Sequence, residues 1–262
     1  MKIHQIRNAT IIVSYGGKRF LIDPMFAPKD TYEPIETGPN PDLRWPIADL
    51  PKPANEIYND IDVIIATHLH PDHFDEYAIN TVRKGVKVFA QDETDRETLV
   101  KLGFSNMAVL SDDEGSPFAG IKLYKTPCKH GEKSKAENLF KANGMRYESM
   151  GVVFKFESEK TLYVAGDTVW YEGVQKTIDK YEPDIIVLNC ADAQMEGCGS
   201  IIMGAEDVEQ VYRYAPNATI IASHMDCVGH AKLNRKELLK YAKSKKFDKS
   251  LIIPKDGEIL EF

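Results

Sequence analysis

The stretch 67–73, Thr-His-Leu-His-Pro-Asp-His, contains three histidines and one aspartate within six residues. It follows the run 62–66, Asp-Val-Ile-Ile-Ala, whose short, β-branched character predicts a strand buried on both faces. The imidazoles and the carboxylate are therefore expected where a core strand ends in a loop. Imidazole nitrogen and carboxylate oxygen are donors that zinc and neighbouring first-row metals prefer. Side chains two residues apart on an extended chain point the same way, so His68 and His70 can contact one ion.

Pro71 bends the chain inside this stretch, and two more candidate ligands, Asp72 and His73, follow it. The bend allows both side chains to turn toward a second ion beside the first. The alternative is an exposed loop that is rich in histidine by chance. The chain has seven histidines, and the clustering of three of them favours a metal site over that alternative.

The length and composition are typical of a globular protein with a sizeable core. The chain has 262 residues, of which 43% are hydrophobic and 28% charged, so we expect one domain over residues 1–262. The net charge of −7 argues against binding to nucleic acid or to anionic membranes, which requires a basic surface. We find no apolar run of membrane-spanning length and no apolar signal core at the start.

The cysteines show no Cys-x-x-Cys spacing, which argues against a zinc ribbon or a redox pair. They are Cys128, Cys190, Cys198 and Cys227. We therefore expect a reduced, cytoplasmic protein that acts on a small molecule. Whether it forms a homo-oligomer stays open.

The pattern of apolar residues and turn signals predicts an α/β architecture, because strands and helices alternate after the histidine stretch. A meander of three strands comes first and ends in Asp23-Pro24. The predicted strands are 2–6, 10–15, 19–22, 62–66, 86–90, 151–156, 161–164, 184–189, 219–222 and 250–253, with strand and turn over 116–127. The predicted helices are 75–83, 94–103, 169–181, 205–214 and 234–245.

Two segments show no regular spacing of apolar residues and are predicted to be loops. Residues 24–53 hold eight of the 14 prolines, and a long irregular segment of this kind is often a lid or a binding loop. Its Arg44 and Trp45 offer a cation beside a stacking surface, which suits an anionic substrate; alternatively, Trp45 only packs the loop onto the core. Residues 132–146 are charged and broken by Gly and Asn, which predicts a mobile loop whose lysines are either solvated or meet an anion.

Four more polar residues follow predicted strands, and each has an ordinary structural alternative. His130, before Gly131, and His224 could be metal ligands, although a lone histidine is more often structural or exposed. Asp167 could bind two ions through its two oxygens, or could cap the next helix. Asp23 could be a turn former, or a carboxylate that orients a ligand histidine from behind. Strand ends of this kind can meet at one rim of a layered α/β fold.

In order along the chain, these segments resemble those of the metallo-β-lactamase-fold hydrolases. The matching residues are Asp23-Pro24, the His-x-His-x-Asp-His stretch, His130-Gly131, Gly166-Asp167-Thr168 and His224. The resemblance implies an αβ/βα four-layer sandwich with two divalent ions at one edge. It also implies the ligands: His68, His70 and His130 for the first ion, Asp72, His73 and His224 for the second, and Asp167 between them.

The resemblance implies hydrolysis as well. Metal-bound water is acidic enough to supply hydroxide near neutral pH, which would attack an ester, lactone or phosphoester of a small substrate, anionic if Arg44 and Trp45 bind it. Asp72 would orient the nucleophile, and His230 would donate a proton or a hydrogen bond. Zinc is the expected metal, with manganese and iron left open. The Asp23-Pro24 start, the His-Gly loop and the segment 224–226 are most similar to the bacterial branch that includes ascorbate-6-phosphate lactonase.

Three other functions agree less well with this sequence than hydrolysis does. A diiron oxidoreductase of the same fold would carry Glu in place of His70 and, usually, a flavin domain. A nuclease of the fold would carry a large inserted domain or a protruding arm, and no segment is long or basic enough for the former. A non-catalytic binding protein is disfavoured because it would be expected to have lost ligands, whereas this chain has the full set.

Overall fold

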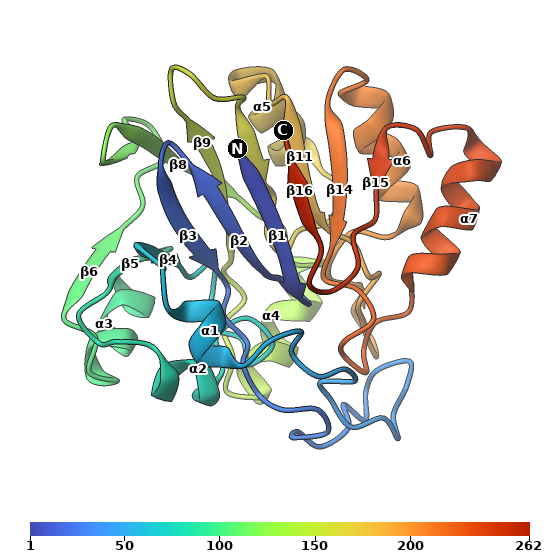
Figure 1. The fold of residues 1–262 in the computed structure, drawn as a ribbon. Coiled ribbons are helices and arrows are strands. Elements are labelled where there is room, and N and C mark those ends of the chain that lie inside the picture. Colours follow the sequence, from blue (N-terminus) through green and yellow to red (C-terminus); the bar gives the residue numbers. More distant parts are fainter.

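The computed structural model describes residues 1–262, which form two seven-stranded sheets packed face to face with helices on both outer faces (Figure 1). The αβ/βα sandwich expected from the resemblance is confirmed. Apolar side chains from both sheets fill the space between them, and aromatic rings such as Phe20 and Phe154 meet edge to face with centroids 5.1 Å apart. Each large apolar side chain removed from water in such a core contributes about 1.5–3 kcal/mol.

The first sheet is antiparallel along its N-terminal meander and parallel beyond it. The pairs β1–β2 and β2–β3 are antiparallel, and β3 to β6 run parallel. In spatial order the strands are β16 (Ile259–Glu261), β1 (Lys2–Arg7), β2 (Thr10–Tyr15), β3 (Lys18–Ile22), β4 (Val63–Ile65), β5 (Lys87–Ala90) and β6 (Asn106–Val109).

The second sheet also combines antiparallel and parallel strand pairs. Its first half along the chain is antiparallel, whereas β10, β11, β14 and β15 run parallel. In spatial order the strands are β15 (Leu251–Ile252), β14 (Thr219–Ser223), β11 (Ile185–Asn189), β10 (Leu162–Val164), β9 (Met150–Lys155), β8 (Ile121–Pro127) and β7 (Ser116–Phe118). A small hairpin, β12 (Gln194–Met195) with β13 (Gly199–Ser200), stands apart from both sheets.

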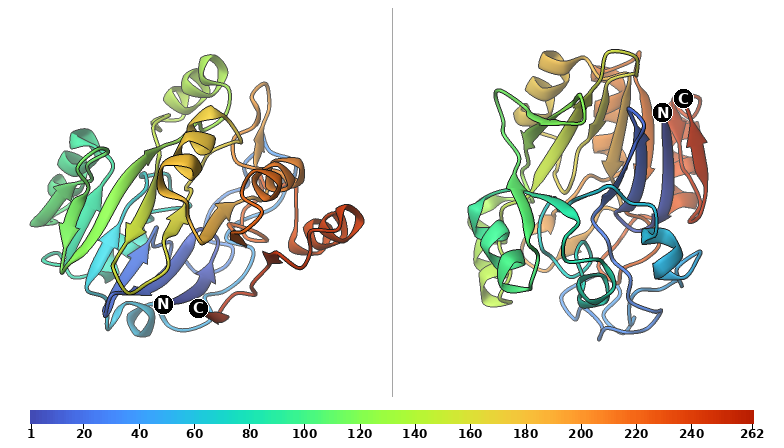
Figure 2. Two further views of the ribbon diagram at one scale, coloured as in Figure 1. Left: turned by 90° about the horizontal axis from the view of Figure 1, so that it is seen from above. Right: turned by 60° about the vertical axis from the view of Figure 1, so that its left-hand side comes forward.

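Helices cover the outer face of each sheet with amphipathic sides (Figure 2). One apolar cluster joins the first sheet to the three helices nearest in sequence, and another joins the second sheet to the remaining four. The former helices are α1 (Ala54–Tyr58), α2 (Glu76–Thr81) and α3 (Glu93–Lys101). The latter are α4 (Lys133–Ala142), α5 (Glu172–Tyr181), α6 (Ala205–Tyr214) and α7 (Arg235–Lys245).

The predicted strands and helices are all present, but part of one predicted loop is a helix and one predicted helix begins later than expected. Residues 133–142 are not a loop but helix α4, because Ala136 and Phe140 lie one turn apart and bury the same face. Helix α5 begins only at Glu172, so Asp167 does not cap it. Helix α3 begins at Glu93 and is capped by Asp92, whose side chain accepts from the backbone N–H of residue 95. Five further elements, α1, β6, β12, β13 and β16, were not predicted from the sequence.

The proline-rich segment 24–53 is irregular, as predicted, and lies beyond one edge of both sheets (Figure 1). Its two ends are tied together by Arg7, a fully buried side chain of β1. The guanidinium donates to the carbonyl oxygens of Met25 and Ala27 at 3.0 and 2.8 Å, and to that of Ala48 at 2.8 Å. The segment is therefore a closed loop whose base is fixed to the first sheet.

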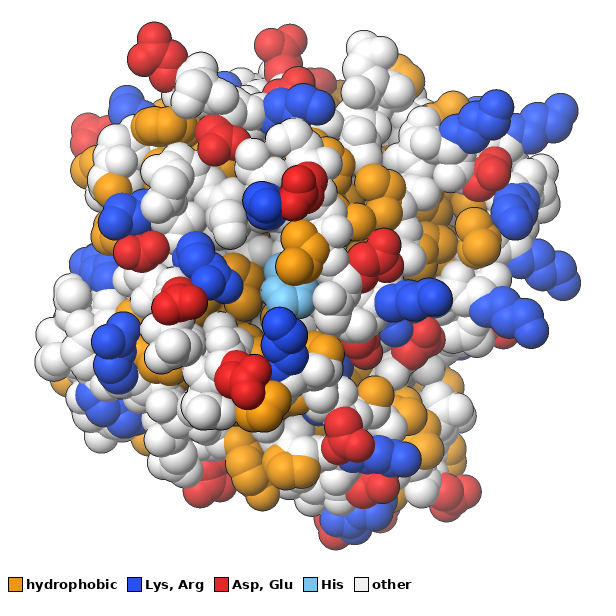
Figure 3. All heavy atoms as spheres, in the orientation of Figure 1, with side chains coloured by type: hydrophobic (Ala, Val, Ile, Leu, Met, Phe, Trp, Pro, Cys, Tyr) orange, Lys and Arg blue, Asp and Glu red, His pale blue; other side chains and the backbone are white.

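The surface carries charges of both signs. Figure 3 shows acidic and basic side chains interspersed over the face in view, with the basic ones concentrated along α7. No helix in the structure combines the length and the apolar character that crossing a membrane requires.

Candidate metal centre

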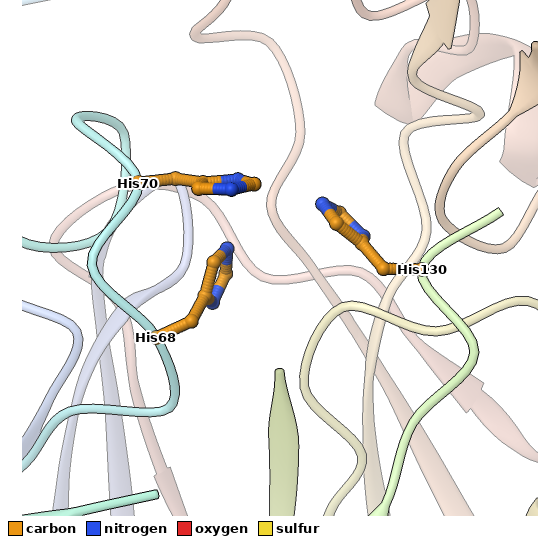
Figure 4. A group of neighbouring side chains, drawn as sticks. All are labelled: His68, His70 and His130. Carbon is orange, nitrogen blue, oxygen red and sulfur yellow. The ribbon is translucent and has the colours of Figure 1, made fainter. Parts of the chain in front are cut away.

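Three imidazoles converge at one edge of the sandwich. His68 and His70 follow β4 of the first sheet, and His130 follows β8 of the second, so the two sheets contribute to one group (Figure 4). All three are buried, and one nitrogen from each lies within 4.8 Å of the others. The edge is the carboxyl end of β4, β8, β10 and β14, which explains why residues far apart in sequence meet there.

Hydrogen bonds fix which nitrogen of each imidazole faces the group. Nε2 of His70 donates to the carbonyl oxygen of Arg146 at 2.7 Å, and Nδ1 of His130 donates to that of Ile201 at 3.0 Å. A carbonyl oxygen can only accept, so the other nitrogen of each ring carries a lone pair. This arrangement is typical of histidines whose second nitrogen binds a metal.

His68 is fixed in the same way through a threonine and a buried aspartate. The Thr67 hydroxyl donates to Asp23 at 2.6 Å and so accepts from Nδ1 of His68, which lies 3.1 Å away. Nε2 of His68 and Nε2 of His130 have no hydrogen-bond partner although both are buried. Buried lone pairs without donors are costly, and a cation between them removes that cost. The residues present therefore fit a divalent metal ion.

A second group lies beside the first. Nε2 of His73 is 3.1 Å from Nε2 of His224, which is itself 3.2 Å from a carboxylate oxygen of Asp72. Nδ1 of His73 donates to Asp23 at 2.8 Å, which turns Nε2 toward this second group. These donors likewise form a group that could hold an ion.

Asp167 lies between the two groups. One of its oxygens is 3.1 Å from Nε2 of His73, and 3.9 Å from Nε2 of each of three further histidines, His68, His130 and His224. Its other oxygen accepts from the side-chain amide of Asn189 at 2.7 Å. Gly166 makes this position possible, because its φ is +69° and a Cβ there would lie 2.3 Å from the carbonyl oxygen of Met150.

The backbone is strained at two of the residues that build this centre. Asp23 has φ 48° and His224 has φ 61°, a left-handed conformation that non-glycine residues adopt at a cost of about 1–3 kcal/mol each. Such strain persists where the surrounding structure fixes the chain. Here it aims Asp23 at His73 and turns His224 into the second group.

The ionisation states suit cation binding. Burial lowers the pKa of His130 to about 3 and that of His68 well below its usual value, so both imidazoles are neutral and can use their lone pairs. Burial acts in the opposite direction on Asp72 and Asp167. The neighbouring His73 and other imidazoles outweigh it and hold the pKa of both carboxyls well below the usual range. Both aspartates are therefore anionic.

A cavity of about 490 Å³ opens over these groups. The 24–53 loop forms one wall, α4 with the residues that follow it forms another, and the segment around β12 and β13 forms the third. The lining residues are Pro34, Ile35, Glu36, Thr37, Trp45, His70, Pro71, Asp72, His130, Phe140, Asn143, Met145, Asp167, Met195, Ile201 and His230. No lysine or arginine is among them, and Glu36 is the one charged side chain outside the two metal groups.

Of the two loop residues predicted to bind substrate, the structure brings only Trp45 to the cavity. Trp45 is 7% exposed and packs against Tyr32, with ring centroids 4.4 Å apart. Arg44 points away from the cavity, because its guanidinium pairs with Glu33 at 2.5 Å and donates to backbone carbonyls of the same loop. The adjacent sequence positions therefore have different surroundings.

His230, predicted to assist the reaction, lines the cavity beside Asp72. Its Nε2 is 3.9 Å from a carboxylate oxygen of Asp72, and its Nδ1 is buried without a partner. Burial lowers the pKa of His230 to about 4, so the ring is neutral at pH 7. It can therefore accept a proton and return it.

Several residues that build the centre were not found from the sequence. Asn8 donates to the backbone oxygen of Asp72 at 2.9 Å, and Asn189 holds Asp167. No feature of the neighbouring sequence distinguishes these asparagines from asparagines in turns or on the surface. Phe140 stacks on His130 with ring centroids 4.9 Å apart, and the helical spacing of Ala136 and Phe140 was the signal that could have placed it.

Asp23→Asn is expected to weaken Zn²⁺ binding about 10–100-fold, as loss of a hydrogen-bond partner behind a ligand typically does. Asparagine tolerates φ 48°, but its amide cannot accept from Thr67 and from His73 as the carboxylate does. Competition with a chromophoric chelator measures the affinity. Asp62→Asn is the matched control, since Asp62 also accepts from a backbone N–H but lies outside the centre. An unchanged affinity in Asp23→Asn would argue against this role.

Comparison with known proteins agrees with this geometry. The family described as the beta-lactamase superfamily domain matches residues 18–225. The UPF0173 protein YddR of Bacillus subtilis (strain 168) is 45% identical over 262 residues, which is 100% of each chain. The chain belongs to the UPF0173 family of the metallo-β-lactamase fold. Another relative, a UPF0173 metal-dependent hydrolase of Rubrobacter xylanophilus (strain DSM 9941 / JCM 11954 / NBRC 16129 / PRD-1), is 28% identical, covering 73% of this chain and 70% of that protein.

A solved structure is similar over the whole chain. It is an isothiocyanate hydrolase from Delia radicum gut bacteria, with a TM-score of 0.94 and 38% sequence identity, covering 100% of this chain and 99% of that one. The Rubrobacter relative is named a metal-dependent hydrolase and the similar structure is that of a hydrolase, and this chain is a metallo-hydrolase of the same superfamily.

Proposed function

We propose that this hydrolase holds two divalent ions, zinc in the first instance, and uses them to hydrolyse a small, uncharged substrate with an apolar substituent. The observation that carries the proposal is the cavity, whose floor is two groups of metal-binding donors and whose walls carry no cation. His68, His70 and His130 hold one ion, Asp72, His73 and His224 hold the other, and Asp167 lies between them. When bound, the ions supply Lewis acidity that makes water nucleophilic near neutral pH.

The chain's own residues orient the reactants. Asp72 lies on the cavity floor and is anionic, so it can accept a hydrogen bond from the attacking water and aim its lone pair. His230, beside it, delivers a proton to the leaving group. Trp45, Phe140 and Met145 exclude bulk water and pack against the apolar substituent.

The lining supports an uncharged substrate over the anionic one considered from the sequence. A carboxylate or phosphate on the substituent, remote from the ions, would find no lysine or arginine on the walls and would face Glu36. Burying such a group without a partner is costly. A phosphorylated lactone, as in the ascorbate-6-phosphate lactonase branch, is for this reason disfavoured.

Isothiocyanates, R–N=C=S, meet these requirements and are our first candidate. They are neutral, their central carbon is electrophilic, and R is often apolar. Water adds to this carbon, the C–N bond breaks, and the nitrogen takes up protons, so that R–N=C=S and H₂O give R–NH₂ and carbonyl sulfide. The similarity to an isothiocyanate hydrolase over the whole chain supports this choice. Uncharged esters and lactones fit the same cavity and are the alternative.

A matched pair of substrates tests the proposal. The zinc-loaded protein is expected to consume phenyl isothiocyanate with kcat/KM about 10-fold or more above that for 4-carboxyphenyl isothiocyanate, since one unpaired charge costs more than about 1.4 kcal/mol. Amine release is measured alongside hydrolysis of 4-nitrophenyl acetate, γ-butyrolactone and bis(4-nitrophenyl) phosphate. Preference for the phosphodiester, or for the carboxylated isothiocyanate, would overturn the proposed substrate class.

A further inference from the structure

The segment 146–150, which leads from α4 into the first residue of β9, contacts every loop that supplies a ligand to the first metal position. Its first contact is direct, because the carbonyl oxygen of Arg146 accepts from Nε2 of His70 at 2.7 Å. The Tyr147 hydroxyl donates to the carbonyl oxygen of Gly131, next to His130, at 3.2 Å. One segment therefore reaches both histidine loops, which come from different sheets.

The other end of the segment reaches the Asp167 loop and the start of the loop that holds His68 and His70. The Ser149 hydroxyl donates to the backbone oxygen of Asp167 at 2.8 Å, and the backbone N–H of Met150 donates to the carbonyl oxygen of Thr67, next to His68, at 3.1 Å. Ser149 and Met150 are buried, so these hydrogen bonds are shielded from water. No hydrogen bond runs from the segment to Asp72, His73 or His224, the ligands that belong to the second position alone.

Arg146 anchors the segment to α3. Its guanidinium binds both oxygens of Asp92, at 3.0 and 2.8 Å, and an oxygen of Asp95 at 2.6 Å. Asp95 is 2% exposed and also accepts from the side-chain amide of Gln91 at 2.6 Å. A planar guanidinium held by two carboxylates has a fixed position, and its own carbonyl oxygen is fixed with it.

Arg146 has no contact with the cavity, so substrate binding does not explain these ion pairs. We propose that residues 146–150 set the orientation of the ligands at the first metal position, with Arg146 as the positioning residue that holds them in place through Asp92 and Asp95. The carbonyl oxygen of Arg146 accepts from Nε2 of His70 and so keeps Nδ1 of that ring turned toward the first metal position. The inference rests on the metal centre proposed above.

Zn²⁺ affinity, measured by chelator competition on the whole chain, tests the proposal without reference to activity. Arg146→Ala is expected to weaken binding about 10–100-fold. Arg146→Lys keeps the charge but not the fork of donors, so it should recover part of the loss. Arg213→Ala is the matched control, because Arg213 also forms an ion pair, with Glu209 on α6, away from the centre. Tyr147→Phe removes one hydroxyl without disturbing the fold, and a smaller loss is expected.

Two variants, each lacking a ligand of one metal position, show at which position the loss of the Arg146 side chain weakens Zn²⁺ binding. His224→Ala leaves the first position intact, and adding Arg146→Ala there should weaken Zn²⁺ binding by the full factor. His130→Ala leaves the second position intact, and adding Arg146→Ala there should change nothing. Equal weakening in both backgrounds, or none in either, would overturn the proposal. Failure of the unmodified protein to bind Zn²⁺ would instead refute the metal centre itself, so the two failures are distinguishable.

Discussion

Asp72→Ala is expected to abolish metal-dependent turnover, with kcat falling by about 10²- to 10⁴-fold, the range that a positioned acid–base group contributes. The substitution removes a ligand of the second position and the anion that orients water. His70→Ala should have a comparable effect through the first position. Steady-state kinetics on the zinc-loaded proteins, with phenyl isothiocyanate or whichever panel substrate is hydrolysed, measure both.

The folds of both variants should survive, because each side chain lies at the edge of the sandwich and not between the sheets. Far-ultraviolet circular dichroism checks this. Asp113→Ala is the matched control for Asp72→Ala, since Asp113 is an aspartate whose side chain is 93% exposed and far from the centre. Full activity in Asp72→Ala or in His70→Ala would refute the assignment of these residues.

Removal of the ions is expected to lower the melting temperature by about 10 °C. A ligand present at 1,000 times its dissociation constant stabilises the folded state by about 4 kcal/mol, and for a chain of this size each kcal/mol corresponds to roughly 2–4 °C. The ligands come from both sheets, so the ions join the two halves of the sandwich.

Calorimetry before and after dialysis against EDTA measures this effect, and re-addition of Zn²⁺ should restore the original value. A variant that carries both His130→Ala and His224→Ala serves as a reference, because it should melt at the same temperature with and without Zn²⁺. Identical melting of the native sequence in EDTA and in Zn²⁺ would be incompatible with ions that bridge the sheets.

Much of the fold could be predicted because strands and helices leave local periodic signals. The histidine stretch also has a local signature, since its ligands are consecutive. His130 and His224 have none: each is a lone histidine after a strand, and only the order of motifs along the chain made them candidates. The pairing of Arg146 with Asp92 and Asp95 joins segments some fifty residues apart, at 54 and 51 positions, and no local pattern encodes it.

The errors have physical causes of the same kind. Helix α4 has many charged residues, and its narrow apolar face, on which Phe140 lies, was therefore not recognised in the sequence. Arg44 and Trp45 are neighbours in sequence, but consecutive side chains of an extended loop point in opposite directions. Trp45 therefore faces the cavity, whereas Arg44 faces Glu33 at the surface. Two adjacent residues therefore do not form one binding unit when the backbone directs their side chains to opposite sides.

The buried guanidinium of Arg7 ties together the two ends of the 24–53 loop, and this has a consequence for engineering. The neck of the loop is fastened to a strand of the first sheet, so the neck keeps its position when residues of the tip are exchanged. Residues 31–45 could thus be grafted from relatives as a cassette. Substrate range would then be adjustable on one wall of the cavity, while the metal-binding donors stay untouched on a rigid base.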